Sequence, residues 1–442
     1  MKKLLVVGIL LAISYGCSKY NAGELTGVKG RKGWFESEPY GMVFVPMGSF
    51  TMGPSDQDVA WAMNSFSKTV SVDAFWMDET EVTNNEYRQF VYWVRDSIMR
   101  RKLGEVIEDY LIAEDDFGNP IDPPIINWDV EIDPRDEEVS EILNELYLAE
   151  HERFYRRKEI DTRKLMFEYY RVDMQQAAKK SNRYDFDTRQ YNGTAINAQG
   201  EQIDVDDRSA FVIRDVINVY PDTLCWISDF TYSFNEPYTN MYFWHPSYDN
   251  YPVVGVNWEQ ARAFSVWRTQ YLNDFLRGEG GGFVQDFRLP NEAEWEYAAR
   301  GNLDLSMYPW GGMYTRNKQG CFLANFKPLR GNYIDDGGLI TVSVGSYAPN
   351  EYGLFDMAGN VAEWTSNAYD ESAYSFQHDM NPDYQYEALP DDPPAMKRKI
   401  VRGGSWKDIG YFLQNGTRTY EYQDSAKSYV GFRNVRSYLG TN

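Results

Sequence analysis

Short apolar runs broken by glycine most limit the fold that this chain of 442 residues can adopt. One such run, residues 41–53, reads GMVFVPMGSFTMG. Glycine and proline at this spacing are typical of short strands joined by tight turns. A further strand is predicted over residues 70–77, and the same pattern returns at residues 251–256. The sequence therefore indicates short strands linked by many loops.

Three helix starts carry a capping box, in which a polar side chain and a Glu or Gln three residues later each bond a free backbone N–H of the first turn. The pairs are Thr83 with Glu86, Asn257 with Gln260, and Asn291 with Glu294. Apolar and aromatic residues follow each pair at helical spacing. These stripes are more typical of a core than of a binding site.

A long charged stretch interrupts this pattern and is interpreted as an insertion over residues 99–246. Its residues 120–134 are rich in proline and aspartate, and residues 137–180 scatter apolar residues among charges. We expect mostly helix with limited burial in the second of these segments. The main domain is then predicted to comprise residues 41–98 and 247–438.

The N-terminus resembles a lipoprotein signal peptide. Lys2 and Lys3 precede an apolar stretch, residues 4–13, that is too short to span a bilayer. The residues that follow, SYGC, resemble a lipobox, with Ser14 where leucine is usual. Residues 1–16 are therefore predicted to be removed, Cys17 to be lipidated, and residues 17–40 to form a tether. This places the chain on the periplasmic face of an outer membrane; an ordinary secretory signal with an incidental cysteine is the alternative.

Composition excludes some partners and leaves the cysteines open. The formal net charge of -22 repels phosphate, so binding of nucleic acid is not expected. Hydrophobic residues make up 43% of the chain, which is enough for a sizeable core. In an oxidising periplasm Cys225 and Cys321 have two options, a disulfide or two separate thiols.

Seven motifs in order resemble one known family. They are residues 46–53, 81–87, 251–258, 288–301, 353–364, 401–406 and 431–433. The set is similar to the formylglycine-generating-enzyme (sulfatase-modifying factor) family. The resemblance implies an α+β fold with a C-type-lectin-like, loop-rich core, here carrying a largely helical insertion.

The chain departs from this family at the metal-binding positions, so we predict that it is not an enzyme. The family's copper chemistry uses two cysteines after the Gly-Gly-Ser motif, because thiolates bind a soft monovalent metal. Those positions are Asp408 and Leu413 in this chain. Relatives that use iron need a histidine cluster. The only histidines, His151, His245 and His378, lack ligand spacing.

Structural Ca²⁺ is a further implication of the resemblance. One family site corresponds to Asn360 and Glu363, and a second corresponds to Asn325 and Asp336. Side-chain and backbone oxygens suit this hard cation. The alternative is that these polar groups cap loop turns, and it is favoured for the second site because its loop is shorter here.

A narrower resemblance rests on segments of the tether and the insertion, together with residues 77–88 of the main domain. Residues 23–30, 77–88, 218–223, 232–238 and 242–245 resemble the GldK/PorK family of gliding-motility lipoproteins. The resemblance implies a structural subunit of the periplasmic ring of the type IX secretion system, self-associating and assembled with a GldN/PorN-like partner. A glycan- or cargo-binding lectin-like lipoprotein is the alternative.

Overall fold

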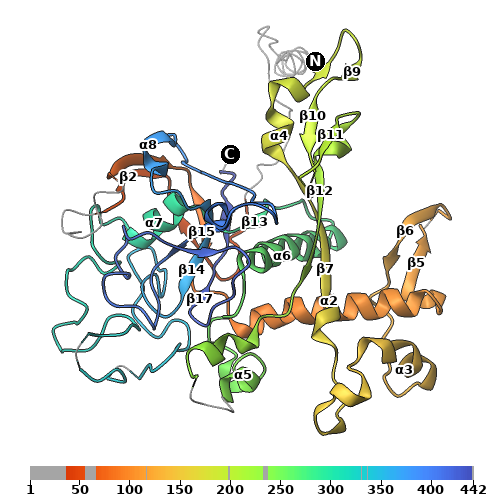
Figure 1. The fold of residues 1–442 in the computed structure, drawn as a ribbon, viewed down its shortest axis with the longest axis horizontal. Helices are drawn as coiled ribbons and strands as arrows, with labels where there is room; N and C mark the ends of the chain where they lie inside the picture. The colour runs from red at the N-terminus through yellow and green to blue at the C-terminus, as the bar shows by residue number, and fades with distance from the viewer. Residues whose placement is uncertain are drawn as a thin grey trace, which may run out of the picture. The chain divides into compact units, whose positions relative to one another are not determined.

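The glycine-broken runs at the start of the chain form strands of two small sheets in a computed structural model of the protein (Figure 1). The structure describes residues 36–54, 66–115, 117–197, 200–231, 237–329, 331–335 and 337–440. Pro39–Tyr438 forms one compact unit. The predicted signal peptide, Cys17 and nearly all of the tether lie outside the described residues. None of the helices in these ranges has both the length and the hydropathy needed to cross a bilayer.

The first and last strands of the unit lie in one antiparallel sheet. Its order is β1 (Met42–Val45), β4 (Phe75–Asp78), β18 (Val435–Ser437) and β13 (Phe287–Arg288). A separate hairpin pairs β2 (Gly48–Met52) with β3 (Lys68–Val72). The single strand predicted over residues 70–77 is thus two strands. The chain leaves the hairpin at Asp73, whose backbone N–H donates to the side chain of Asn381 at 2.9 Å.

A second four-stranded sheet is built from the last third of the chain. Its order is β16 (Thr419–Tyr422), β15 (Arg398–Arg402), β14 (Ala362–Ala368) and β17 (Val430–Gly431). Only the β14–β17 pair is parallel. The described residues between 301 and 361 contain no helix or strand, which confirms the loop-rich character of the domain.

Three helices begin at the predicted capping boxes. They are α2 (Asn84–Gly104), α6 (Trp258–Gly278) and α7 (Glu292–Arg300), and in each the reciprocal hydrogen bonds are formed. The stripes that follow are buried as predicted. Tyr87 of α2 stacks on Phe264 of α6 at 5.6 Å between ring centroids. Trp364 of β14 is fully buried beside them and donates its indole N–H to the carbonyl of Val256.

The insertion is not largely helical, which corrects the prediction. Its helices are short: α3 (Glu137–Leu143), α4 (Met174–Ala178) and α5 (Pro237–Met241). Its strands are β5 (Leu111–Glu114), β6 (Pro120–Ile126), β7 (Met166–Val172), β8 (Tyr184–Asp185), β9 (Gln190–Tyr191), β10 (Thr194–Ile196), β11 (Gln202–Asp204) and β12 (Val212–Asn218). The charged residues 137–164 lack a continuous apolar face, so only one short helix and several 3₁₀ turns form there.

A two-stranded ribbon of β7 and β12 forms the middle of the insertion (Figure 1). Phe167 and Tyr169 are buried, whereas Met166 and Tyr170 on the other face are exposed. This alternation has the period of a strand, not that of a helix. The ribbon is fixed to α6 because Asp215 accepts from both Arg171 (2.6 Å) and Arg262 (3.2 Å).

Candidate functional site

The turn after β15 leads to Asp408 and Leu413, the positions that the resemblance assigns to the copper-binding cysteines. Its Gly404 has a φ of +68°, and a Cβ there would lie 2.8 Å from the carbonyl oxygen of Phe412. Asp408 accepts a 2.6 Å hydrogen bond from Ser405, and burial raises the pKa of its carboxyl. Leu413 is fully buried in an apolar cluster that includes Tyr308 and Phe326. The two positions therefore hold one hydrogen-bonded carboxylate and one core leucine.

The insertion covers this turn. Trp226 stacks on Trp406, with the ring centroids 6.2 Å apart and the planes 22° from parallel. Asp229, from the same segment, accepts from Lys407 and from Ser428. The Asp229 side chain is only 4% exposed. The loop that follows the Gly-Gly-Ser motif is thus packed against the chain's own aromatic and acidic side chains.

The remaining cysteines and histidines are dispersed. Cys225 is a buried free thiol, whose pKa is raised by burial, and Cys321 is an exposed free thiol. The three histidines, His151, His245 and His378, are exposed. Across the described ranges no three His, Cys, Asp or Glu side chains are grouped closely enough to hold a metal ion.

A buried acidic cluster lies where several motifs meet. It consists of Glu81, Asp356 and Glu363 around a single cation, Arg433, and each of the four is at most 6% exposed. Arg433 donates to both carboxylate oxygens of Glu363, at 2.6 and 2.7 Å. Glu81 accepts from the backbone N–H of Val361 at 3.1 Å. Three carboxylates thus share one guanidinium in a dry environment.

The structure brings Asn360 and Asn325 into hydrogen-bond contact, whereas Glu363 is hydrogen-bonded to other residues. The Asn360 amide donates to Glu81 at 2.7 Å, and its oxygen accepts from the N–H of Val342 at 2.9 Å and from Asn325 at 3.4 Å. Glu363 accepts from the indole of Trp295 as well as from Arg433. These oxygens already have N–H donors, which would have to move away for Ca²⁺ to bind. Calcium at Asn360 and Glu363 therefore stays a prediction of the resemblance.

The second predicted calcium pair is described in part. Asn325 is buried and donates to the carbonyl of Ile340 at 2.7 Å. Its backbone carbonyl also accepts from the N–H of Asn360. Asp336 lies outside the described residues. Asn325 therefore acts, in this arrangement, as a link between two loops.

Burial raises the pKa of two carboxyls of the acidic cluster. It raises the pKa of Asp356 to about 6 and that of Glu81 well above its ordinary range. A carboxyl whose pKa is higher in the folded state binds more protons there than in the unfolded chain. Stability from these groups is therefore greatest below the unfolded pKa and declines as pH rises through the folded pKa. For Asp356 the decline runs from about pH 4 to beyond pH 6.

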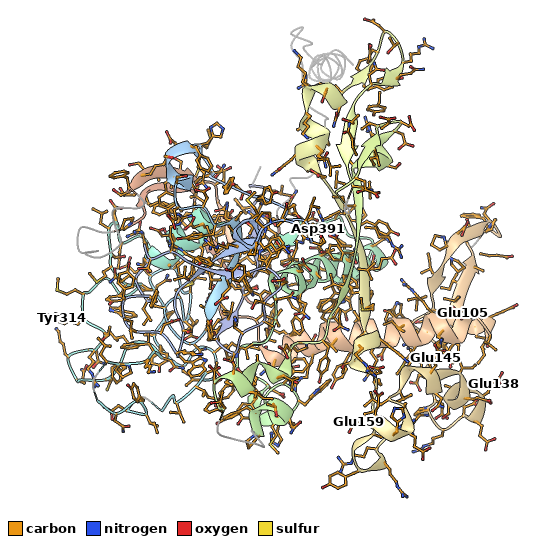
Figure 2. The ribbon with its side chains drawn as sticks, viewed as in Figure 1. Glu105, Glu138, Glu145, Glu159, Tyr314 and Asp391 are labelled. Atoms are coloured by element: carbon orange, nitrogen blue, oxygen red, sulfur yellow. The ribbon has the colours of Figure 1, made fainter. Side chains whose placement is uncertain are left out.

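Asp356→Asn is therefore expected to raise the free energy of unfolding above pH 6, by about 1–3 kcal/mol, and to flatten its dependence on pH. Asparagine suits the site because Asp356 has a φ of +54°, which Asn tolerates. The measurement is urea unfolding of both proteins between about pH 5 and pH 8. Asp391→Asn, an exposed acid (Figure 2), is the control and should leave the profile unchanged. A parallel profile for Asp356→Asn would contradict the assignment.

A second buried network joins α7 to β15. Glu296 accepts from Arg300 at 2.6 Å and also from Arg402, and all three side chains are at most 2% exposed. Glu296 also accepts from the backbone N–H of Gly53. Arg418 is paired with Glu292 at 2.6 Å next to it. Most charged residues of the motifs thus serve as buried ion pairs of the scaffold.

Sequence reasoning did not assign roles to Glu81, Asp356, Arg433 or Glu296. All four lie inside the motifs that carried the resemblance. Glu296 and Asp356 had a signal, since each is a charged residue flanked by apolar ones, as in Trp295-Glu296-Tyr297, whereas Glu81 and Arg433 each have a polar neighbour. A charge that is flanked in this way is expected to be buried and paired.

Comparison with known proteins gives a family and relatives. The model of the sulfatase-modifying factor enzyme 1-like domain matches residues 33–125 and 219–438. Inactive C-alpha-formylglycine-generating enzyme 2 of Bos taurus is 33% identical over 189 residues, 41% of this chain and 49% of the bovine protein. The formylglycine-generating enzyme of Thermomonospora curvata is 31% identical over 188 residues, 42% of this chain and 55% of that protein. The chain thus spans about half the length of these relatives.

Among solved structures, PvdO from Pseudomonas aeruginosa aligns with a TM-score of 0.44 at 16% identity. The alignment covers 90% of this chain and 94% of PvdO. The curated relatives include a protein named as an enzyme and one named as inactive. Residues 126–218, in the insertion, fall outside the family match.

Proposed function

The chain belongs to the sulfatase-modifying factor enzyme 1-like domain family, and from this premise we propose that it is a non-catalytic, structural member. We propose that it is an outer-membrane lipoprotein of the GldK/PorK kind. In this role it is a subunit of the periplasmic ring of the type IX secretion and gliding machinery, assembled with a GldN/PorN-like partner.

The observation that carries the non-catalytic part is the environment of Asp408 and Leu413. Thiolate ligands are absent from both positions, and Leu413 belongs to the core. Trp226 and Asp229 of the insertion pack over the adjoining residues. A substrate approaching this loop would have to displace that packing. A family member built in this way is better suited to holding partners than to oxidising a thiol.

The assembly part is supported by exposed apolar side chains and acidic residues of the insertion. The ribbon presents Tyr170, Val172 and Val216 on its outer face, each at least 47% exposed. The hairpin of β5 and β6 carries Phe117, which is 90% exposed. Glu105, Glu138 and Glu159 lie exposed around the α3 region, where Glu145 is paired with Lys102 (Figure 2). Apolar patches beside acidic ones favour protein partners with basic rims.

Affinity purification of the tagged full chain from detergent-solubilised membranes tests the proposal. We expect a GldN/PorN-like protein to be recovered by mass spectrometry and large rings to be seen by electron microscopy. Cys17→Ala should shift the chain from the membrane to the soluble fraction, because its acyl anchor would be lost. Cys321→Ala is the matched control and should stay in the membrane. A monodisperse monomer without that partner, or a membrane-bound Cys17→Ala protein, would contradict the proposal.

A further inference from the structure

A pocket opens beside the end of β14, away from the turn that holds Asp408. Its volume is about 420 Å³, which falls within the range of small-ligand sites. Residues that line it include Tyr369, Asp370, Glu371, Ser372, Tyr384 and Arg398. They come from β14, the turn after it, the segment near residue 384, and the start of β15. The walls thus combine aromatic rings with charged and hydroxyl groups.

Arg398 is the cation of this pocket, and it has no carboxylate partner among the described residues. Its guanidinium stacks on the ring of Tyr420 at 4.3 Å. Its Nε is buried and has no hydrogen-bond partner in the described structure. The Nε of Arg402 on the same strand also lacks a partner, but Arg402 and the nearby Arg418 are paired with the carboxylates of Glu296 and Glu292. Because Arg398 lines the pocket without a carboxylate partner, its guanidinium is suited to an acceptor supplied from outside.

Acceptors and aromatic surfaces complete the pocket. Asp370 is held in place because it accepts from the backbone N–H and the hydroxyl of Ser372, both at 2.7 Å. Glu371 beside it is exposed and makes no ion pair with any described residue. Tyr369 packs on Tyr420 at 4.7 Å between centroids. Tyr420 thus supports the Tyr369 ring, which lines the pocket next to planar polar groups of both signs.

From this arrangement we propose that the pocket binds a neutral oligosaccharide. A sugar hydroxyl both donates and accepts, so it matches a guanidinium beside carboxylates, whereas the C–H face of a sugar ring packs on tyrosine. Two carboxylates and one guanidinium leave no excess positive charge, which disfavours an acidic sugar or a peptide carboxylate. The site is independent of the proposed ring assembly.

The test is calorimetric titration of the full chain with maltotriose, cellotriose and N-acetylated chitotriose. Trigalacturonate and a peptide with a free C-terminal carboxylate serve as comparisons. At least one neutral trisaccharide should bind in the millimolar range or more tightly. Arg398→Ala removes a hydrogen-bond donor to the ligand, and Glu371→Gln replaces a charged acceptor by a weaker neutral one. Each should therefore weaken that binding about tenfold or more.

Two variants test whether a loss of binding results from misfolding. Glu371→Gln changes an exposed side chain and is expected to fold. It therefore tests the proposal even if Arg398→Ala fails to fold. Arg214→Ala removes an exposed arginine of the ribbon and should leave the affinity unchanged. No binding of any neutral trisaccharide, equal binding by Glu371→Gln, or preferential binding of trigalacturonate or the peptide would each overturn the proposal.

Discussion

Glu296→Ala is expected to lower the free energy of unfolding by about 3–5 kcal/mol, because it leaves buried cations without their counter-ion. Arg300 and Arg402 both donate to this carboxylate, and neither side chain is more than 2% exposed. The N–H of Gly53 loses its acceptor as well. Helix α7, strand β15 and the end of the first hairpin are therefore expected to loosen together. Urea unfolding near neutral pH measures the effect.

Glu138→Ala is the matched control for this loss. Glu138 lies on α3 with its side chain exposed (Figure 2), so its removal should change stability by no more than about 0.5 kcal/mol. Similar losses in the two variants would show that Glu296 is not the centre of the network. Glu296→Gln keeps the shape of the side chain and should fall between the two, because it still accepts hydrogen bonds but carries no charge.

Arg433→Ala is expected to lower the free energy of unfolding by about 3–5 kcal/mol near pH 7.5. This loss of stability should become smaller as the pH falls. Without the guanidinium, three buried carboxyls face one another. Their folded pKa values then rise further, so the fold gains stability as they take up protons at lower pH. Arg433 also donates to the carbonyls of Asp78 and Phe355, and those bonds are lost at every pH.

The comparison is made by urea unfolding at about pH 7.5 and about pH 5, with Arg214→Ala as control. Arg214 also pairs with a carboxylate in two places, Glu168 Oε1 and Oε2, but its side chain is 61% exposed. That pair is expected to contribute no more than about 1 kcal/mol. A loss in Arg433→Ala that is the same at both pH values would contradict the role assigned to the carboxyl cluster.

Local signals in the sequence were enough for the helices of the domain. Thr83, Asn257 and Asn291 each begin a helix as predicted, since a capping box is satisfied by residues three apart and needs no distant partner. The ribbon was misread because Phe167 and Tyr169 lie in the charged stretch, residues 137–180, for which mostly helix with limited burial was predicted. They form a strand because they pair with residues 212–218, a partner that lies more than 40 residues further along the chain.

The candidate site was predictable only in part, for the same reason. Asp408 and Leu413 could be placed by counting from Ser405 because the motif is contiguous. The acidic cluster could not be, since Glu81 and Arg433 lie at opposite ends of the domain and meet only through the pairing of β4 with β18. The partners of Glu363 likewise come from α7 and from the residues before β18. Contacts of this kind depend on the tertiary fold, which no local pattern reports.

The ribbon of β7 and β12 also allows the segment that follows β7 and precedes β12 to be replaced by another sequence. Val172 and Val212, at its far end, are paired directly across the two strands, so the 39 residues between them begin and end at neighbouring points. A two-residue turn closes such a hairpin equally well. The segment between these valines can thus be shortened, lengthened or replaced during evolution while the domain keeps its own packing. Related chains are free to acquire new partners at this position without any change in the scaffold that carries them.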